Sequence, residues 1–138
     1  MTLRFTLLFL LMGFPLLGEE ELVFYSSAPL VLKKSQLRDL YLGRLFEIRK
    51  NSVRPVVRSE GKAHEIFLKD FIFKNLSQFK RHWKKMLFTG KATPPPSVEG
   101  EIQGFSLLRK KRDDRTVWLF YSLKSEDPEG LYRVQVDP

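Results

Sequence analysis

Val117-Trp118-Leu119-Phe120-Tyr121 is the stretch that decides the fold, because it is an unbroken run of large apolar residues in a strongly charged chain. A strand with one wet face alternates apolar and polar residues, whereas a continuous run is typical of a strand covered on both faces. The run therefore predicts a central strand with a layer of protein on each side.

Further strands are predicted before and after this run. Leu22-Val23-Phe24-Tyr25 is a short apolar run that ends at Ser26-Ser27, and it predicts a second buried strand. Residues 53–57 are rich in valine, but Pro55 lies among them. Proline cannot donate to a ladder, so this strand is predicted to be interrupted or to lie at an edge. Alternation over residues 131–136 predicts a last strand.

Four segments between these strands repeat apolar residues at helical spacing. Ser35 is predicted to cap the first helix, which ends at Gly43, and Ser77 to cap the third. His64 is predicted to face outward. The apolar faces are Leu37, Leu40 and Tyr41; Ala63, Ile66, Phe67 and Phe71; Phe79, His82, Trp83, Met86 and Leu87; and Ile102, Phe105 and Leu108.

The order of these elements predicts the fold class. Strands separated by helices imply crossover connections and a mostly parallel sheet with helices on both faces. We therefore predict an α/β three-layer sandwich. Residues 19–138 are long enough to bury one hydrophobic core without disulfide bonds, so they are expected to form one domain.

Residues 1–18 are predicted to be a signal peptide. Arg4 is followed by an uncharged apolar stretch over residues 5–17, then by Gly18 and three glutamates. This pattern is typical of a secretory leader, and the stretch is too short for a comfortable membrane span. We predict cleavage after Gly18 and export of residues 19–138. An uncleaved N-terminal anchor is the alternative.

Composition excludes several kinds of site. The chain has no cysteine and two histidines, which excludes disulfides, thiol nucleophiles and cysteine-bound metals. The sequence has no Ser-His-Asp order, nucleophile elbow, Walker loop or carboxylate pair suited to acid–base work. An enzyme is therefore the least favoured class, and no cofactor or metal is predicted. The net charge of +8 favours anionic partners, but an exported protein rarely meets nucleic acid, so none is predicted.

Two polar segments follow predicted strands, where ligands bind in parallel sheets, close to helix N-termini. They are Ser26-Ser27 and Arg58-Ser59-Glu60-Gly61-Lys62. In the second segment, Gly61 would leave the backbone N–H groups at the start of the helix accessible to an anion. Ser59 would add a hydroxyl donor, while Arg58 and Lys62 would add charge-assisted bonds. The residues alone leave open a simpler interpretation, in which Ser59 caps the helix and both cations lie in solvent.

The run Leu37-Arg38-Asp39-Leu40-Tyr41-Leu42-Gly43-Arg44 resembles a leucine-rich helix end found in phosphate-type periplasmic substrate-binding proteins of ABC importers. The resemblance covers about residues 20–125. It continues in order through Arg54-Pro55-Val56, Ser59-Glu60-Gly61, Phe67, Phe79-Lys80-Arg81-His82-Trp83, Phe88-Thr89-Gly90 and Pro94-Pro95. It implies one lobe of a type II periplasmic binding protein, in the periplasm. It also implies non-catalytic binding of phosphate or another small oxyanion, and a membrane transporter or sensor as partner.

Carried over by position, the resemblance implies a ligand set of Ser26, Ser27, Arg58, Ser59, Gly61 and Lys62. The chain departs from the family at three places. Lys62 stands where the family has a small hydroxyl residue, and Glu60 adds negative charge beside the expected anion. The late Gly-Tyr of the family is replaced around Phe120-Tyr121. About one lobe is present, and an anion in an open lobe is screened, which predicts weak affinity.

Two other functions remain open at this stage. One is an envelope protein-interaction module that keeps the fold without the ligand and docks through basic helical faces or the strand edge near Pro55. The other is binding to a polyanion or a membrane surface, driven by the positive charge. The sequence also leaves open whether two copies pair as a homodimer to rebuild a cleft.

Overall fold

The computed structural model describes residues 21–112, 115–123 and 127–138. The predicted leader and its cleavage site lie outside these residues. No helix in the described part is long and apolar enough to cross a membrane. In chain order the elements are β1 (Leu22–Ser26), β2 (Val31–Lys33), α2 (Lys34–Tyr41), β3 (Glu47–Ile48), β4 (Asn51–Pro55), β5 (Val57–Arg58), α3 (Lys62–Phe67), the π-helical turn η1 (Leu68–Ile72), α4 (Leu76–Phe88), β6 (Ser97–Val98), α5 (Glu101–Lys110), β7 (Val117–Leu123), β8 (Tyr132–Arg133) and β9 (Gln135–Asp137).

The central sheet has the strand order β3-β4-β7-β1-β8, with β7 in the middle as predicted. β4 runs parallel to β7. In two short pairs outside this sheet, β2 runs parallel to β9 and β5 runs parallel to β6. β1 runs antiparallel to β7 and to β8, so the sheet is mixed. The predicted α/β class is confirmed. The direction of β1 was not predictable from the order of strands and helices along the chain, because no single crossover helix connects β1 to its neighbour β7.

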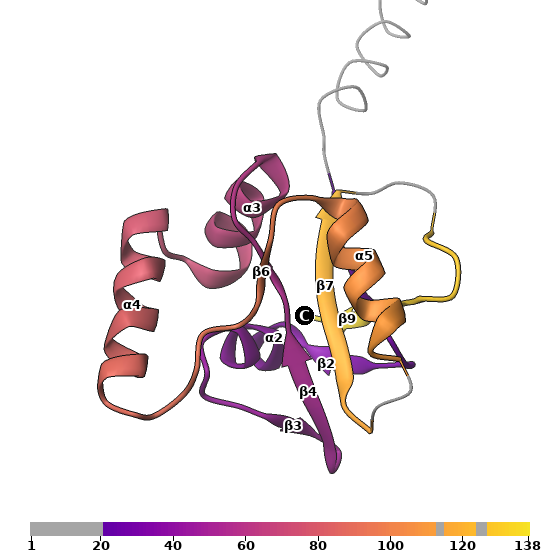
Figure 1. Ribbon diagram of the computed structural model, residues 1–138, viewed down its shortest axis with the longest axis horizontal. Coiled ribbons are helices and arrows are strands. Elements are labelled where there is room, and N and C mark those ends of the chain that lie inside the picture. Colours follow the sequence, from indigo (N-terminus) through magenta and orange to yellow (C-terminus); the bar gives the residue numbers. More distant parts are fainter. Residues whose placement is uncertain (1–20, 113–114, 124–126) are drawn as a thin grey trace, which may run out of the picture.

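β7 separates two hydrophobic cores through its alternating side chains. Val117, Leu119 and Tyr121 enter the larger core, which α2, α3 and α4 cover. Trp118 and Phe120 enter a smaller core under α5. Figure 1 shows α5 lying along β7 and α4 at the outer edge of the molecule, beyond α3. The predicted layers on both faces of the sheet are therefore present.

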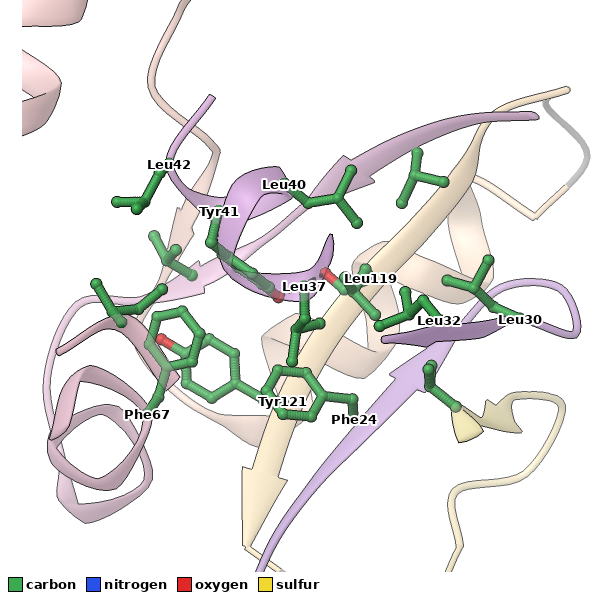
Figure 2. Packing of buried hydrophobic residues seen from close by; sticks show 14 of the residues in the cluster. Phe24, Leu30, Leu32, Leu37, Leu40, Tyr41, Leu42, Phe67, Leu119 and Tyr121 are labelled. Atoms are coloured by element: carbon green, nitrogen blue, oxygen red, sulfur yellow. Dashed lines mark hydrogen bonds between the residues drawn. The ribbon is translucent and has the colours of Figure 1, made fainter. Parts of the chain in front are cut away.

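The larger core is built around aromatic rings (Figure 2). The rings of Phe67 and Tyr121 stack with their centroids 4.1 Å apart, and Phe24 lies 5.8 Å from Tyr121. Tyr41 from α2 is fully buried, and its hydroxyl donates to the carbonyl of Val56 at 3.0 Å. Aromatic pairs of this kind add to the free energy gained by burial alone.

Two helices begin before their predicted caps. α2 starts after Lys33, whose N–H donates to the side chain of Gln36 at 2.8 Å, so Ser35 lies inside the helix. α4 starts after Asn75, which exchanges two hydrogen bonds with Gln78. This reciprocal pair satisfies two N–H groups of the first turn, which is why it starts the helix in preference to a single serine.

The second predicted helix changes its winding along its length. Residues 62–67 are α-helical, and Leu68–Ile72 form a π-helical turn, which is wider. The wider turn buries Leu68 and Ile72 and leaves Phe71 half-buried. His64 is 4% exposed, so its predicted outward position is wrong. His64 lies in the regular α-helical part and shares the buried face with Phe67, three residues later.

Gly43 ends α2 at the predicted place. Its φ of +72° lies in the left-handed region, and a Cβ added there would lie 2.7 Å from the ring of Trp83. Gly90 has nearly the same φ, +70°, but an added Cβ would meet nothing within 4 Å. The two glycines therefore share a backbone conformation and differ in the space around them.

We expect Gly43→Ala to lower the free energy of unfolding by more than Gly90→Ala. Both variants carry a backbone cost of about 1–2 kcal/mol. Only Gly43→Ala also displaces Trp83, which adds an overpacking cost of about 1–3 kcal/mol. Urea denaturation followed by tryptophan fluorescence measures the difference. Equal losses in the two variants would show that Trp83 moves aside without cost.

Candidate functional site

The two predicted ligand segments lie at opposite ends of the sheet. The antiparallel register places Ser26 beside Leu119 and Leu22 beside Leu123. The loop from Arg58 to Lys62 lies at the other end, where β7 finishes near Leu123. The structure therefore does not bring the two segments together. The single site predicted from the sequence assumed that β1 and β4 run in the same direction, and this assumption was wrong.

Ser26 and Ser27 are buried and hydrogen-bonded to the backbone. The Ser26 hydroxyl donates to the carbonyl of Ala28 at 2.6 Å. The Ser27 hydroxyl accepts the N–H of Trp118 at 2.8 Å, and the Ser27 N–H donates to the Trp118 carbonyl at 3.0 Å. These bonds fix the turn after β1 against the start of β7. Ligand binding by either hydroxyl would require this turn to open.

The residues of the second segment face two neighbouring cavities. Arg58 and Lys62 line one of about 490 Å³, called here the Arg58 cavity, together with the start of α5. Ser59 and Gly61 line another of about 590 Å³ between α3 and α4, called here the α3–α4 groove. Glu60 lines the groove and not the Arg58 cavity. The predicted set is thus split, with its two cations on one side.

The Arg58 cavity joins these cations to a helix N-terminus. α5 begins at Glu101 after Gly100, and both residues line the cavity. Gly100 offers no side-chain cap, and the N–H groups of a first helical turn have no partner within the helix. The Nε of Arg58 is buried and has no hydrogen-bond partner among the described residues. Cations, free N–H groups and the positive end of a helix dipole suit an anion.

Glu101 is an acidic residue that the sequence analysis did not assign to the site. Its carboxylate accepts a hydrogen bond from the hydroxyl of Ser122, which is buried at the end of β7. A carboxylate in the first turn of a helix interacts favourably with the helix dipole. The same charge opposes a second anion in the Arg58 cavity. An acidic residue after a glycine at a helix start is the sequence signal that points to it.

A buried polar pair holds the start of the loop. The backbone N–H of Arg58 donates to the Tyr121 hydroxyl at 3.0 Å, and this hydroxyl lies 2.6 Å from Nδ1 of His64. The hydroxyl has one hydrogen, so it satisfies all three groups when it donates to an unprotonated Nδ1. Burial, with smaller effects from the charges of Arg58 and Lys80, lowers the pKa of His64 to about 4. Burial also raises the pKa of Tyr121, so both groups are neutral at pH 7.

Tyr121 and His64 hold the start of the loop, and the sequence pointed to them only in part. The resemblance drew attention to Phe120-Tyr121 as a departure, without a role for the hydroxyl. The available signal for His64 was helical spacing, because it lies three residues before Phe67 and shares its buried face of α3. The described residues hold no group of three or more His, Asp or Glu side chains arranged to bind a metal ion.

Comparison with known proteins gives a likeness of fold. No protein-family model matches the chain, and no curated protein matches it. Among solved structures, it is similar to an ABC-type phosphate transport receptor from Vibrio cholerae, with a TM-score of 0.50 and 10% sequence identity. The match covers 85% of this chain and 46% of the receptor chain. At this identity, the likeness shows an architecture similar to part of a periplasmic binding protein and nothing about the ligand.

We expect the free energy of unfolding to fall as the pH falls from 6.5 to 4. The folded pKa of His64 is about 4 and its ordinary value is 6.5, so the unfolded chain binds this proton first. This difference in pKa corresponds to about 3 kcal/mol of stability. The stabilisation is fully present above pH 6.5 and is lost progressively as the pH falls to 4. Urea denaturation at a series of pH values measures the slope.

His64→Gln is the matched variant, because glutamine offers Tyr121 an acceptor without titrating in this range. Its slope between pH 6.5 and 4 should be clearly flatter than that of the original chain. His82→Gln is the control, since His82 bonds to the Leu42 carbonyl at 2.8 Å and not to Tyr121. Identical slopes in the original chain and His64→Gln would contradict the assignment.

Proposed function

We propose that this chain is a non-enzymatic domain that binds a small oxyanion, phosphate or a close chemical relative, in the Arg58 cavity. The observation that carries the proposal is the lining of this cavity, which joins Arg58 and Lys62 to the first turn of α5. A tetrahedral oxyanion offers several acceptor oxygens, so it can take bonds from a guanidinium and from backbone N–H groups together.

The charges around the cavity indicate weak binding. Arg58 and Lys62 attract an anion, while Glu101 repels it at short range. Lys62 and Ile102 at the rim are exposed, so the bound anion would stay in contact with water and salt. Under these conditions Coulomb attraction is small. We expect an affinity near the millimolar range, equivalent to about 4 kcal/mol.

The leader pattern supports export of residues 19–138, so we propose a periplasmic location. The similar solved structure is described as a phosphate transport receptor of the ABC type. By analogy with it, a membrane transporter or sensor is the proposed protein partner. No cofactor and no nucleic acid form part of this proposal.

Calorimetric titration of residues 19–138 with phosphate, at low and moderate salt, tests the oxyanion site. Arg58→Gln should remove the saturable heat, because it deletes the guanidinium and leaves the backbone bond to Tyr121 in place. Glu101→Gln should tighten binding about fivefold, since it removes about 1 kcal/mol of repulsion. Its amide oxygen still accepts from Ser122.

Lys110→Gln is the charge control for Arg58→Gln, because it also removes one positive charge, but at the far end of α5. Binding by this variant should match that of the original chain. Sulfate serves as the competitor that tests selectivity. The oxyanion proposal fails if neither the original chain nor Glu101→Gln gives saturable heat at millimolar phosphate.

An envelope protein-interaction module is the second candidate function. The observation that favours it is the rim of the α3–α4 groove, where Phe73 and Leu76 are exposed large apolar side chains. Exposed apolar patches are common where proteins dock. Failure of the phosphate titration would leave this module as the better supported function.

A further inference from the structure

We propose that the outward face of α4 docks the domain on an anionic lipid bilayer. This α4 basic face consists of Arg81, Lys84, Lys85, Leu87 and Phe88. It lies apart from the Arg58 cavity, whose lining comes from α3, α5 and the end of β7. The inference therefore goes beyond the proposed function and does not depend on it.

The first observation is a long stretch without acidic residues. Between Asp70 and Glu99 the sequence contains no aspartate or glutamate. The same stretch carries six cations: Lys74, Lys80, Arg81, Lys84, Lys85 and Lys91. Cations four residues apart on a helix repel each other when no acid lies between them. A partner with many negative charges would relieve this repulsion.

The second observation is a large apolar side chain among these cations. Phe88 is 87% exposed and Leu87 is 56% exposed, at the last turn of α4. At helical spacing, Phe88 shares a face with Arg81, Lys84 and Lys85, which are seven, four and three residues earlier. An exposed phenylalanine next to several cations is typical of a helix that lies at a membrane interface. The apolar residues of such a helix enter the boundary between headgroups and acyl chains.

The opposite face of α4 fixes this orientation. Phe79 and Trp83 are buried in the larger core. The Trp83 indole N–H donates to the carbonyl of Tyr41 at 3.2 Å, and Nε2 of His82 bonds to the Leu42 carbonyl at 2.8 Å. α4 therefore cannot rotate to bury Phe88 without breaking these bonds. The basic face is exposed, on a helix that lies at the outer edge of the molecule (Figure 1).

The chemistry of the face favours a bilayer over other polyanions. All of its residues are exposed, and they combine cations with two large apolar side chains. A bilayer satisfies both features at once, because anionic headgroups attract the cations and the interface accepts Phe88 and Leu87. A purely polar polyanion would use the cations and leave the apolar side chains in water.

Vesicle co-sedimentation tests the proposal. Every element of the described fold lies within residues 21–138, so the assay uses residues 19–138, which also removes the apolar stretch 5–17. We expect binding to vesicles of phosphatidylglycerol and phosphatidylcholine and none to phosphatidylcholine alone. Lys84→Glu with Lys85→Glu should weaken binding at least about tenfold. Phe88→Ala should also weaken it, by several-fold.

Matched variants separate this face from general charge and hydrophobicity. Lys50→Glu with Lys110→Glu makes the same change in net charge elsewhere, and Ile102→Ala removes another exposed apolar side chain. Both should bind like the original chain. Circular dichroism confirms that each variant is folded. Equal weakening by the two charge pairs, or no binding at low salt, would overturn the proposal.

A tryptophan placed at the tip of the face reports insertion directly. The fluorescence of Phe88→Trp should shift to shorter wavelength on addition of phosphatidylglycerol vesicles, and that of Ile102→Trp should not. Binding to heparin should respond to the charge reversal and not to Phe88→Ala. If vesicle binding shows the same pattern as heparin, with no effect of Phe88, the face binds polyanions in general and the bilayer proposal is wrong.

Discussion

The burial of β7 on both faces is the constraint on which the rest of the structure depends. Val117, Leu119 and Tyr121 face one core, and Trp118 and Phe120 face the other. A strand with no solvent-exposed face requires a covering layer on each side, and here helices form both layers. α5 supplies one layer, while α2, α3 and α4 supply the other. The starts of α3 and α5 then fall at the same end of β7, which is where the Arg58 cavity forms.

Tyr121 connects this core to the candidate site. Its ring stacks on Phe67 inside the larger core, while its hydroxyl holds the Arg58 N–H and Nδ1 of His64. A buried polar group without a partner is costly, so each member of this trio stabilises the positions of the other two. The packing that forms the core therefore also determines where Arg58 enters its cavity. The site is an extension of the core and does not depend on a free loop.

Local patterns predicted the elements, and long-range pairing decided how they meet. The apolar run of β7, the broken strand at Pro55 and the helix end at Gly43 each rest on neighbouring residues, and each was predictable. The direction of β1 depends on a partner far away in the sequence, so the expected meeting of Ser26-Ser27 with the second segment failed. The hydrogen bond between Glu101 and Ser122 depends on the approach of α5 to the end of β7, which the local Gly100-Glu101 pattern does not show.

Charge is distributed in two different ways over this domain, and the difference bears on affinity. In the Arg58 cavity, Glu101 offsets part of the charge of Arg58 and Lys62. A compensated, water-exposed site holds one small anion weakly, because each attraction is screened and partly cancelled. The α4 basic face lies within residues 71–98, a stretch of sequence that contains no acidic residue. Several weak attractions to one extended surface act together there. The net charge of the chain is therefore better suited to locating the domain on a surface than to strengthening its hold on a single ion.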